Sequence, residues 1–248
     1  MATQVFKIPE SFKKDARYSF CPGCDHGVAV RLVGECLDEL GLTENTITAT
    51  SIGCSVGIYD FLNVDAIEAP HGRALAVATG VKRAQPDKFV FTYQGDGDFA
   101  SIGWAESMHC AFRGENLSAI CINNTTYGMT GGQLGPTTLL GQVTTTSPTG
   151  RNVEYYGYPV KIAEHIALSD GTAYSARVSL DTVANIRKAK QAIKKAFEVQ
   201  LRGLGFGFVE ILSSCPTNWR MTPEQAHERV RNDMMPVFKL GVYKDITV

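Results

Sequence analysis

Two polar turns, 25 residues apart, constrain the fold of this chain more than any other feature. The first is Gly-Asp-Gly at 95–97 and the second is Asn-Asn at 123–124, and each follows an apolar run. The segment between them has room for one helix, so the pattern predicts a βαβ unit. In such a unit both strand ends lie at the same edge of a parallel sheet. We therefore expect Asp96 and Asn124 to be neighbours in space.

The residue types in these turns suit a magnesium ion. Asp96 can offer a carboxylate oxygen and Asn124 an amide oxygen, and the backbone carbonyl of Thr126 can complete the protein half of an octahedral site. Gly95 and Gly97 let the backbone approach a diphosphate, and the following helix directs free N–H groups at the same anion. The turns predict a metal–diphosphate site; the alternative is glycine-rich turns in an ordinary α/β protein.

The rest of the chain alternates between helix and strand patterns. Helical spacing occurs at 27–40, 73–85, 161–168, 181–201 and 223–234, and strand patterns occur at 46–52, 88–94, 173–178 and 207–212. We assign Asp181 as the cap of the fourth of these helices, and Thr222 and Pro223 to the start of the last. This alternation predicts an α/β fold, with a mostly parallel sheet and helices on both faces.

The domain organisation is expected to be simple. We interpret 1–248 as a single domain with an N-terminal arm over 1–20 and a C-terminal extension over about 214–248. The segment 125–157 has no periodic element, and a loop of this length inside a compact domain is usually functional.

Charge and hydropathy exclude some classes of partner. The net charge of −1 argues against nucleic acid, because binding to it requires clustered positive charge. The one dense cationic run falls on the helix at 181–201, where a solvated face is the simplest interpretation and a docking patch for an acidic electron carrier the alternative. No segment reaches the roughly 18–20 apolar residues of a membrane span, and the N-terminus lacks the apolar core of a signal peptide. We therefore expect a cytoplasmic protein.

Seven cysteines are present. The cytosol keeps thiols reduced, so we expect no disulfide framework. Cys36, Cys110 and Cys121 occupy apolar positions inside elements and are expected in the core. The other four fall in turns or at strand ends, where side chains can reach a shared point: Cys21, Cys24, Cys54 and Cys215. Four thiolates suit either tetrahedral Zn²⁺ or a [4Fe–4S] cluster, and spacing alone does not choose between them.

Six motifs, in chain order, resemble the β subunit of 2-oxoacid:ferredoxin oxidoreductases, a branch of the thiamine diphosphate enzymes. They are CPGCDHG at 21–27, SIGCS at 51–55, HGRALAVATGVKRAQP at 71–86, GDGDFASIG at 95–103, NNTTYGMTGGQLGPTT at 123–138 and SCPTNW at 214–219. Together they span most of the chain. The spacing of Gly-Asp-Gly and Asn-Asn is similar to the diphosphate-binding signature of these enzymes.

The resemblance implies a fold, a set of cofactors and a reaction. The fold is the diphosphate-binding half of the thiamine diphosphate-binding fold, and the cofactors are thiamine diphosphate, Mg²⁺ and a [4Fe–4S] cluster held by the four motif cysteines. The reaction is oxidative decarboxylation of a 2-oxoacid with coenzyme A to acyl-CoA, CO₂ and reduced ferredoxin. Alternatives are a structural zinc site or redox pair at CxxC, or a zinc or iron–sulfur binding subunit without catalysis of its own.

The resemblance also implies particular site residues. His71 is the candidate catalytic residue, because a neutral imidazole suits proton transfer near neutral pH; the alternative is donation to a phosphate oxygen. His26 is predicted to donate to a cluster sulfur, or else to be an exposed loop histidine. The residues carried over as cofactor-binding are Ser55, His71, Gly72, Gly95, Asp96, Gly97, Asp98, Asn124, Tyr127, Gly128, Met129 and Thr130.

Partner chains are expected, because thiamine also needs an activating carboxylate that a second, similar domain supplies in this superfamily. Glu106 and Glu115, in the middle and at the end of one helix, are poor candidates for that group. We expect an α-type subunit that completes the site, together with γ and δ subunits. Ferredoxin must be a separate chain, because the CxxCxxCxxxCP run is absent.

The substrate is expected to be a branched-chain 2-oxoacid. The loop from Thr125 to Gly150 has no basic residue that could bind a distal carboxylate, and Gly131 stands in its Thr-Gly-Gly step, whereas some relatives that use 2-oxoglutarate place a lysine in this loop. The alternatives are a 2-oxoglutarate enzyme, with the partner supplying the arginine, and a non-redox thiamine diphosphate decarboxylase or carboligase.

Overall fold

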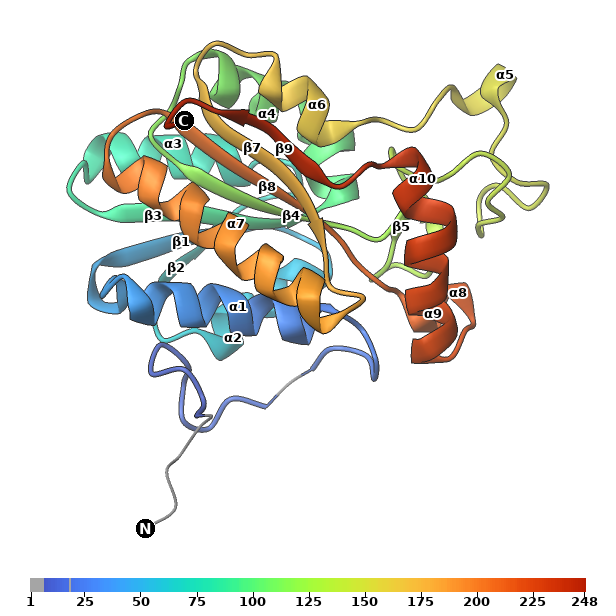
Figure 1. Cartoon of the computed structure of the whole chain (residues 1–248), viewed down its shortest axis with the longest axis horizontal. Helices are drawn as coiled ribbons and strands as arrows, with labels where there is room; N and C mark the ends of the chain where they lie inside the picture. Colours follow the sequence, from blue (N-terminus) through green and yellow to red (C-terminus); the bar gives the residue numbers. More distant parts are fainter. Residues whose placement is uncertain (1–6, 18) are drawn as a thin grey trace.

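A computed structural model of the chain describes residues 7–17 and 19–248. These residues form a seven-stranded sheet in the order β2-β1-β3-β4-β8-β7-β9 (Figure 1). Every neighbouring pair is parallel except β7 and β9. The strands are β1 (Thr46–Thr50), β2 (Asp65–Glu68), β3 (Phe89–Gly95), β4 (Ser118–Asn123), β7 (Thr172–Ser179), β8 (Phe206–Leu212) and β9 (Gly241–Asp245).

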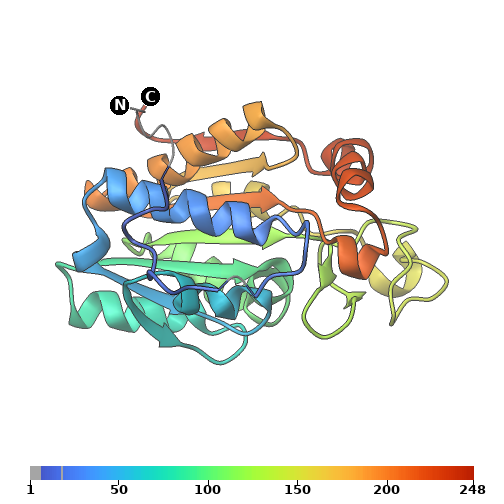
Figure 2. The same cartoon turned by 90° about the horizontal axis from the view of Figure 1, so that it is seen from below.

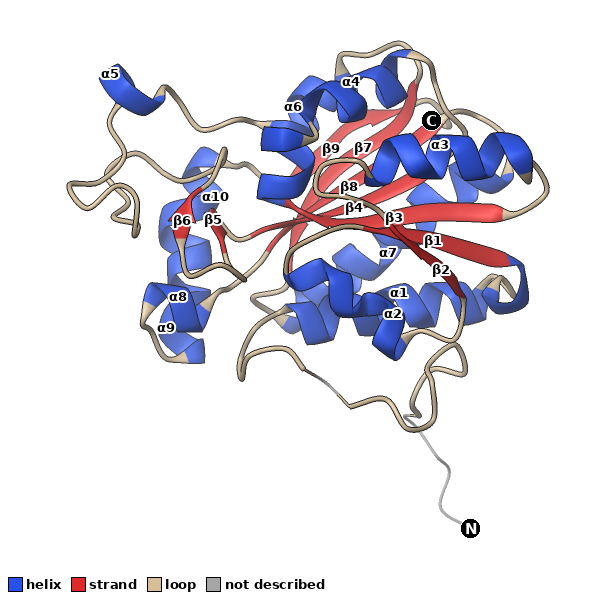
Figure 3. Cartoon of the chain, turned by 180° about the vertical axis from the view of Figure 1, so that it is seen from behind, coloured by secondary structure: helices blue, strands red, loops and turns tan. Residues whose placement is uncertain are grey.

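Helices cover both faces of this sheet, as predicted (Figures 1 and 3). One face carries α1 (His26–Glu39) and α7 (Val183–Leu201), and the other carries α3 (Ala74–Ala84), α4 (Trp104–Phe112) and α6 (Ile162–Ala167). The central strands are buried on both faces, which explains their near-continuous apolar sequence. Among the described residues, no helix is long and apolar enough to span a bilayer.

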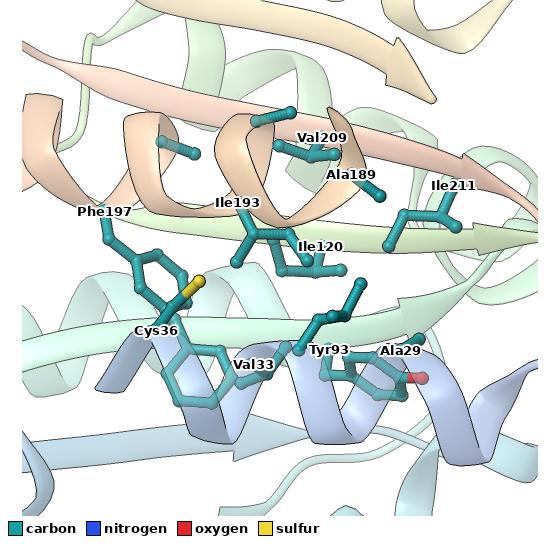
Figure 4. Packing of buried hydrophobic residues seen from close by; sticks show 14 of the residues in the cluster. Ala29, Val33, Cys36, Tyr93, Ile120, Ala189, Ile193, Phe197, Val209 and Ile211 are labelled. Atoms are coloured by element: carbon teal, nitrogen blue, oxygen red, sulfur yellow. The ribbon is translucent and has the colours of Figure 1, made fainter. Parts of the chain in front are cut away.

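The main core lies between the sheet and the helices α1 and α7. Val33 and Cys36 of α1 pack with Ile193 and Phe197 of α7 and with strand residues such as Ile120 (Figure 4). All five are fully buried, and burial of each large apolar side chain stabilises the fold by about 1.5–3 kcal/mol. The apolar spacing that predicted these two helices is therefore the spacing of their buried faces.

The cysteines expected in the core are there. Cys36, Cys110 and Cys121 are fully buried, and all seven cysteines, each within the described residues, are free thiols. The predicted absence of a disulfide framework agrees with this.

Two strands were not predicted, for physical reasons. All four residues of β2 are exposed, so no apolar alternation marks it. None of the residues of the antiparallel edge strand β9 is fully buried, and it pairs with β7 through an irregular register. Edge strands carry a weak sequence signal because only one of their sides is paired and little of their surface is buried.

The predicted cap of α7 was wrong by one residue. Thr182 is the cap, and its hydroxyl accepts a hydrogen bond from the Asn185 amide at 3.2 Å. Asp181 instead accepts from Ser179 and from the Asn185 side chain. The extended backbone of Thr182 directs its side chain at the free N–H groups of the first turn. At α9 (Pro223–Arg229), the predicted start at Thr222 is confirmed as a capping box with Gln225.

The cationic run on α7 is partly neutralised by neighbouring elements. Lys190 lies 2.7 Å from Glu35, and Lys194 lies 2.9 Å from Glu39, both on α1. Such exposed pairs each contribute only about 0–1 kcal/mol to stability. They nonetheless favour the solvated-face interpretation over a docking patch for an acidic carrier.

A separate layer of short helices closes the carboxyl-terminal end of β8 (Figure 2). It contains α8 (Pro216–Trp219), α9, a π turn (Val230–Met234) and α10 (Met235–Val237). Trp219, Val230 and Met234 form a third apolar cluster with Leu139 from the long loop and Leu212 from β8. The proposed division into an arm, a domain and a C-terminal extension stays a prediction, and residues 1–6 and 18 of the arm lie outside the described part.

The long loop after β4 holds small elements that have no sequence periodicity. It contains a hairpin of two short antiparallel strands, β5 (Thr126–Tyr127) and β6 (Gln133–Leu134), and the single helical turn α5 (Val153–Tyr156). Arg151 is buried and donates to the backbone carbonyls of six residues, Gly135, Pro136, Thr138, Tyr156, Gly157 and Tyr158. This arginine holds the two ends of the loop together.

Candidate functional site

The carboxyl ends of β1, β3 and β4 lie side by side at one edge of the sheet. Gly95 at the end of β3 pairs with Ile122 of β4, so the two polar turns leave the sheet at the same level. A pocket of about 100 Å³ opens between them, and both Asp96 and Asn124 line it. The predicted proximity of these two residues is therefore present in the structure.

The pocket gathers most of the residues carried over from the motifs. It is lined by His26, Ile52, Gly53, Cys54, Ser55, His71, Gly95, Asp96, Gly97, Asp98, Asn124, Thr126, Tyr127, Gly128, Met129 and Thr130. Of the residues expected to bind the cofactor, only Gly72 is outside this set. A Cβ atom at Gly72 would lie 2.7 Å from the backbone nitrogen of Gly103. Gly72 thus permits a close approach of two backbone segments behind the pocket.

Asp96 is a buried carboxyl group whose hydrogen-bond donors are all uncharged. Its Oδ2 accepts a hydrogen bond from the Thr137 hydroxyl, and only 2% of the residue is exposed. Burial raises the pKa of Asp96 to about 7, although the Thr137 hydroxyl and the Gly97 amide act in the opposite direction. A cation beside this group would displace the proton and favour the charged carboxylate.

The two residues of the Asn-Asn pair have different positions: Asn123 is bonded to the neighbouring strand, and Asn124 lines the pocket. Asn123 donates to the Glu210 carboxylate on β8 at 2.7 Å and accepts from the Thr125 amide at 3.1 Å. Thr125 has a positive φ of 59°, a conformation that this turn imposes on a β-branched residue. Asn124 faces the pocket, and its Oδ1 accepts from the Thr126 amide at 3.2 Å.

Asp98 orients its neighbours. Its Oδ1 accepts from Ser51 Oγ at 2.7 Å, from the Gly72 amide at 2.6 Å and from His71 Nδ1, while Gln94 donates to Oδ2. These bonds occupy the carboxylate. The bond at Nδ1 leaves Nε2 of His71 as the ring nitrogen available to a ligand. Asp98 is therefore placed to hold His71, which lines the pocket and is one-third exposed.

The ring of Tyr127 explains why residue 97 is glycine. A Cβ atom at Gly97 would lie 2.3 Å from Cε1 of Tyr127, and the Tyr127 hydroxyl donates to the Gly97 carbonyl at 3.3 Å. The ring also meets His71 edge to face, with centroids 6.1 Å apart. Gly97 is thus required by the packing of this aromatic wall of the pocket, in addition to the proposed approach of a diphosphate.

Of the four turn cysteines, Cys54 lines the same pocket, and burial, together with the charges of other members of the group, raises the pKa values of Cys24, Cys54 and Cys215. Burial, and then the negative charges of Cys215 and Cys21, raise the pKa of Cys54 to about 11. The pKa of Cys24 rises to about 12 through burial first, with Cys215 and Cys54 adding to the effect. Cys54 and Cys215 also share a neighbourhood: a Cβ atom at Gly128 would lie 3.4 Å from Sγ of Cys54 and 3.6 Å from Nδ2 of Asn218, which donates to Sγ of Cys215 at 3.2 Å. Cys54 also lines the pocket, so it connects the cysteine group with the metal–diphosphate turns.

The separation of these cysteines does not suit a single ion. Within the described part of the chain, no group of three or more His, Cys, Asp or Glu side chains could hold one metal ion. A [4Fe–4S] cluster is a cube of eight atoms with one thiolate at each iron corner, so its ligands stand further apart than those of one ion.

His26 is buried, and its backbone N–H faces a cysteine sulfur. Only 2% of it is exposed, so it is not an exposed loop histidine, and its Nδ1 bonds to the Tyr93 hydroxyl at 2.9 Å while its ring stacks on Phe20. Burial lowers the pKa of His26 to about 4. The group of His26 that approaches the Cys24 sulfur is its backbone N–H. The prediction that His26 donates to a cluster sulfur stays a prediction, and its backbone N–H is the group placed to make that bond.

The two nearby glutamates are occupied by arginines. Glu106 lies 2.6 Å from Arg73, and Glu115 pairs with Arg83 and Arg113 at 2.5 and 2.6 Å. Neither lines the pocket. This agrees with the expectation that both are poor candidates for an activating carboxylate.

Five residues that support the site were missed by sequence reasoning. Thr137 donates a hydrogen bond to Asp96. Both Ser51 and Gln94 donate to Asp98. Glu210 accepts from Asn123, and Asn218 donates to the sulfur of Cys215 at 3.2 Å. Three of the five lie inside the six motifs: Ser51, Thr137 and Asn218. Their place in a motif was the signal from which they could have been predicted. Gln94 precedes a motif directly, and Glu210 carried no local signal because its partner is in another strand.

Comparison with known proteins places this site in a class. Residues 49–211 match the family described as thiamine pyrophosphate enzyme, C-terminal TPP binding domain. That range covers β1 to β8 and so includes both polar turns and Cys54. The fold and the site are thus those of a thiamine pyrophosphate-binding domain.

Similar proteins place the chain more narrowly within the thiamine pyrophosphate enzymes. The chain is 45% identical over 226 residues to the ketoisovalerate oxidoreductase subunit VorA of Methanothermobacter thermautotrophicus, covering 91% of this chain and 47% of that protein. It is 38% identical over 200 residues to the 2-oxoglutarate synthase subunit KorB of Methanocaldococcus jannaschii, covering 80% of this chain and 69% of that protein. The chain spans about half the length of the VorA relatives it matches.

A solved structure shows the same architecture. A 2-oxoglutarate:ferredoxin oxidoreductase from Magnetococcus marinus, with 2-oxoglutarate, coenzyme A and succinyl-CoA bound, matches with a TM-score of 0.79 and 27% identity, covering 98% of this chain and 86% of that one. The chain belongs to the family of thiamine diphosphate-binding subunits of 2-oxoacid:ferredoxin oxidoreductases.

Proposed function

We propose that this chain is the β-type subunit of a 2-oxoacid:ferredoxin oxidoreductase that oxidatively decarboxylates a 2-oxoacid and transfers the acyl group to coenzyme A. One observation carries the proposal: Cys54 lines the pocket that holds Asp96 and Asn124 and also belongs to the group of four cysteines. A site for a metal-bound diphosphate thus adjoins a site for an electron acceptor.

The residues of the pocket fit magnesium and a diphosphate. Asp96, Asn124 and the carbonyl of Thr126 would hold the ion, since hard cations prefer oxygen ligands. The raised pKa of Asp96 supports this role, because a buried carboxyl group gains most from a neighbouring cation. Bound thiamine diphosphate would supply the nucleophilic carbon and the electron sink. His71, oriented by Asp98, would bind a phosphate oxygen or carry a proton at Nε2.

Cys21, Cys24, Cys54 and Cys215 would hold the [4Fe–4S] cluster. Backbone N–H groups already point at two of the sulfurs, from His26 to Cys24 and from Asn218 to Cys215. Such donors stabilise thiolates bound to iron. A non-redox decarboxylase or carboligase would leave this group of four cysteines without a function.

The active site is proposed to be completed by an α-type partner subunit. Glu106 and Glu115 are held by arginines, and the carboxylate that activates thiamine is proposed to come from this partner. An apolar surface suits such a contact: Val143, Tyr155 and Tyr158 on the long loop are 66%, 80% and 71% exposed. Further γ and δ subunits, coenzyme A and ferredoxin are proposed as partners, in keeping with a cytoplasmic location.

The substrate is proposed to be a branched-chain 2-oxoacid. Among the described residues that line the pocket, none is lysine or arginine, and the exposed side chains of Ile52 and Met129 are apolar. Arg151, the nearest basic residue in the loop sequence, is fully engaged with backbone carbonyls. The similarity to ketoisovalerate oxidoreductase subunits supports the same choice.

The test is to co-express the chain with its partner subunits and purify the complex without oxygen. We expect iron, sulfide and thiamine diphosphate in the complex, and dye reduction that requires both a 2-oxoacid and coenzyme A. Among 3-methyl-2-oxobutanoate, 2-oxoglutarate and pyruvate, the first should give the highest kcat/KM. Activity without coenzyme A or without iron would contradict the proposal, and a preference for 2-oxoglutarate would contradict only the substrate assignment.

A further inference from the structure

Asn218 connects two parts of the site, the group of four cysteines and the loop that follows the Asn-Asn turn. It lies on α8, three residues after Cys215. Its Nδ2 atom donates to the Gly128 carbonyl at 2.9 Å and to Cys215 Sγ at 3.2 Å. The backbone N–H of Asn218 also approaches the same sulfur. One amide group therefore contacts both a cysteine of the proposed cluster and the loop that follows the Asn-Asn turn.

The loop is shaped to receive this side chain. A Cβ atom at Gly128 would lie 3.3 Å from Nδ2 of Asn124, 3.4 Å from Sγ of Cys54 and 3.6 Å from Nδ2 of Asn218. Gly128 is thus the point at which a proposed metal ligand, Asn124, a proposed cluster ligand, Cys54, and the amide of Asn218 meet. Four residues on, a Cβ atom at Gly132 would lie 3.3 Å from Oδ1 of Asn218, so a larger residue there would crowd the amide.

The hydrogen bond to sulfur has an electronic consequence. An N–H group that donates to a cysteine ligand withdraws negative charge from the sulfur. Reduction of an iron–sulfur cluster adds negative charge, so the donor favours the reduced form and raises the reduction potential. The second hydrogen of Nδ2 is held by the Gly128 carbonyl, which keeps the amide from rotating away from the sulfur.

We infer that Asn218 is a positioning residue that sets the potential of the cluster and ties it to the cofactor loop. The inference rests on the proposed function, because it requires that Cys215 bind the cluster. It goes beyond that function by assigning a role to a residue that is not itself a ligand of metal, cofactor or substrate. The bond that transmits the effect is the contact from Nδ2 to Sγ.

The test uses the complete, anaerobically purified complex with two variants. Asn218→Asp keeps the shape of the side chain but replaces the donor with a negatively charged acceptor, and Asn218→Ala removes the group. The measurement is a redox titration of the cluster followed by electron paramagnetic resonance, with iron and thiamine diphosphate contents determined on the same samples. Thr217→Ala, an exposed neighbour on α8, is the matched control.

We expect a more negative potential in both variants, with the larger shift in Asn218→Asp. At the wild-type midpoint potential, the ratio of oxidised to reduced cluster should rise at least about twofold in Asn218→Ala, since the loss of one hydrogen bond is worth about 0.5–1.5 kcal/mol. The control should titrate like the wild type. A merely structural contact would lower cluster or thiamine content without moving the potential of the clusters that remain.

The outcomes separate the inference from the function on which it rests. A wild-type complex without a cluster signal would overturn the proposed function and the inference together. A wild-type complex with a normal signal, and variants whose potentials coincide with it, would overturn the inference alone. If Asn218→Asp fails to assemble, the potential of Asn218→Ala decides the question in the same way.

Discussion

The protonation of Asp96 leads to a quantitative prediction for the separately expressed chain without cofactor. Burial raises the pKa of this carboxyl group from 3.8 to about 7. The folded chain then holds the proton more tightly than the unfolded chain, so its free energy of unfolding falls as the pH rises through that window and levels off above it. At about 1.4 kcal/mol per pKa unit, the full loss is about 4 kcal/mol.

The variant Asp96→Asn removes the titrating group and keeps an oxygen that can accept from Thr137. We expect the free energy of unfolding of the variant, relative to wild type, to be larger by about 3 kcal/mol at about pH 8.5 than at about pH 5. Urea denaturation at the two pH values measures this difference. The exposed variant Asp87→Asn is the control and should follow the pH dependence of the wild type.

The same variant tests the metal assignment. Magnesium and thiamine diphosphate together should raise the unfolding midpoint of the wild type at about pH 8.5, less so below about pH 7, where the proton competes with the ion. They should leave Asp96→Asn unchanged. Parallel pH curves for wild type and Asp96→Asn would refute the reasoning about the buried carboxyl group. Cofactor-dependent stabilisation of the variant would refute the role of Asp96 as a ligand.

Three further predictions concern the sheet, the pocket wall and the cysteines. Arg177→Met strands the fully buried carboxylate of Glu210, its partner at 2.9 Å, and should lower the free energy of unfolding by about 3–5 kcal/mol in urea denaturation; a loss below 1 kcal/mol would contradict this. Gly97→Ala forces the Tyr127 ring to move and should cost about 1–3 kcal/mol in the same assay, whereas Gly95→Ala, with no atom within 4 Å of its new Cβ, should cost less; equal losses would speak against the packing argument. Cys54→Ser in the complete complex should cut coenzyme A-dependent dye reduction by at least about tenfold while thiamine content stays normal, and unchanged reduction would remove Cys54 from the proposed electron path.

Much of the fold could be predicted because its signals are local. Each predicted helix and strand corresponds to an element of the structure, since apolar spacing reports the buried face of one segment at a time. The neighbouring positions of Asp96 and Asn124 followed from a general rule about parallel strands. The two strands of the main sheet that were missed, β2 and β9, lie at its edges and bury little apolar surface.

Covalent order and periodicity are enough to place particular residues at strand ends and particular cysteines in turns, because both are properties of one segment at a time. The pairing of side chains depends instead on the folded arrangement of the elements. Gly128 and Asn218 are 90 residues apart, and Asn123 and Glu210 are 87 apart. A hydrogen bond acts over about 3 Å, so its existence depends on how the elements pack, and spacing along the chain carries no record of it.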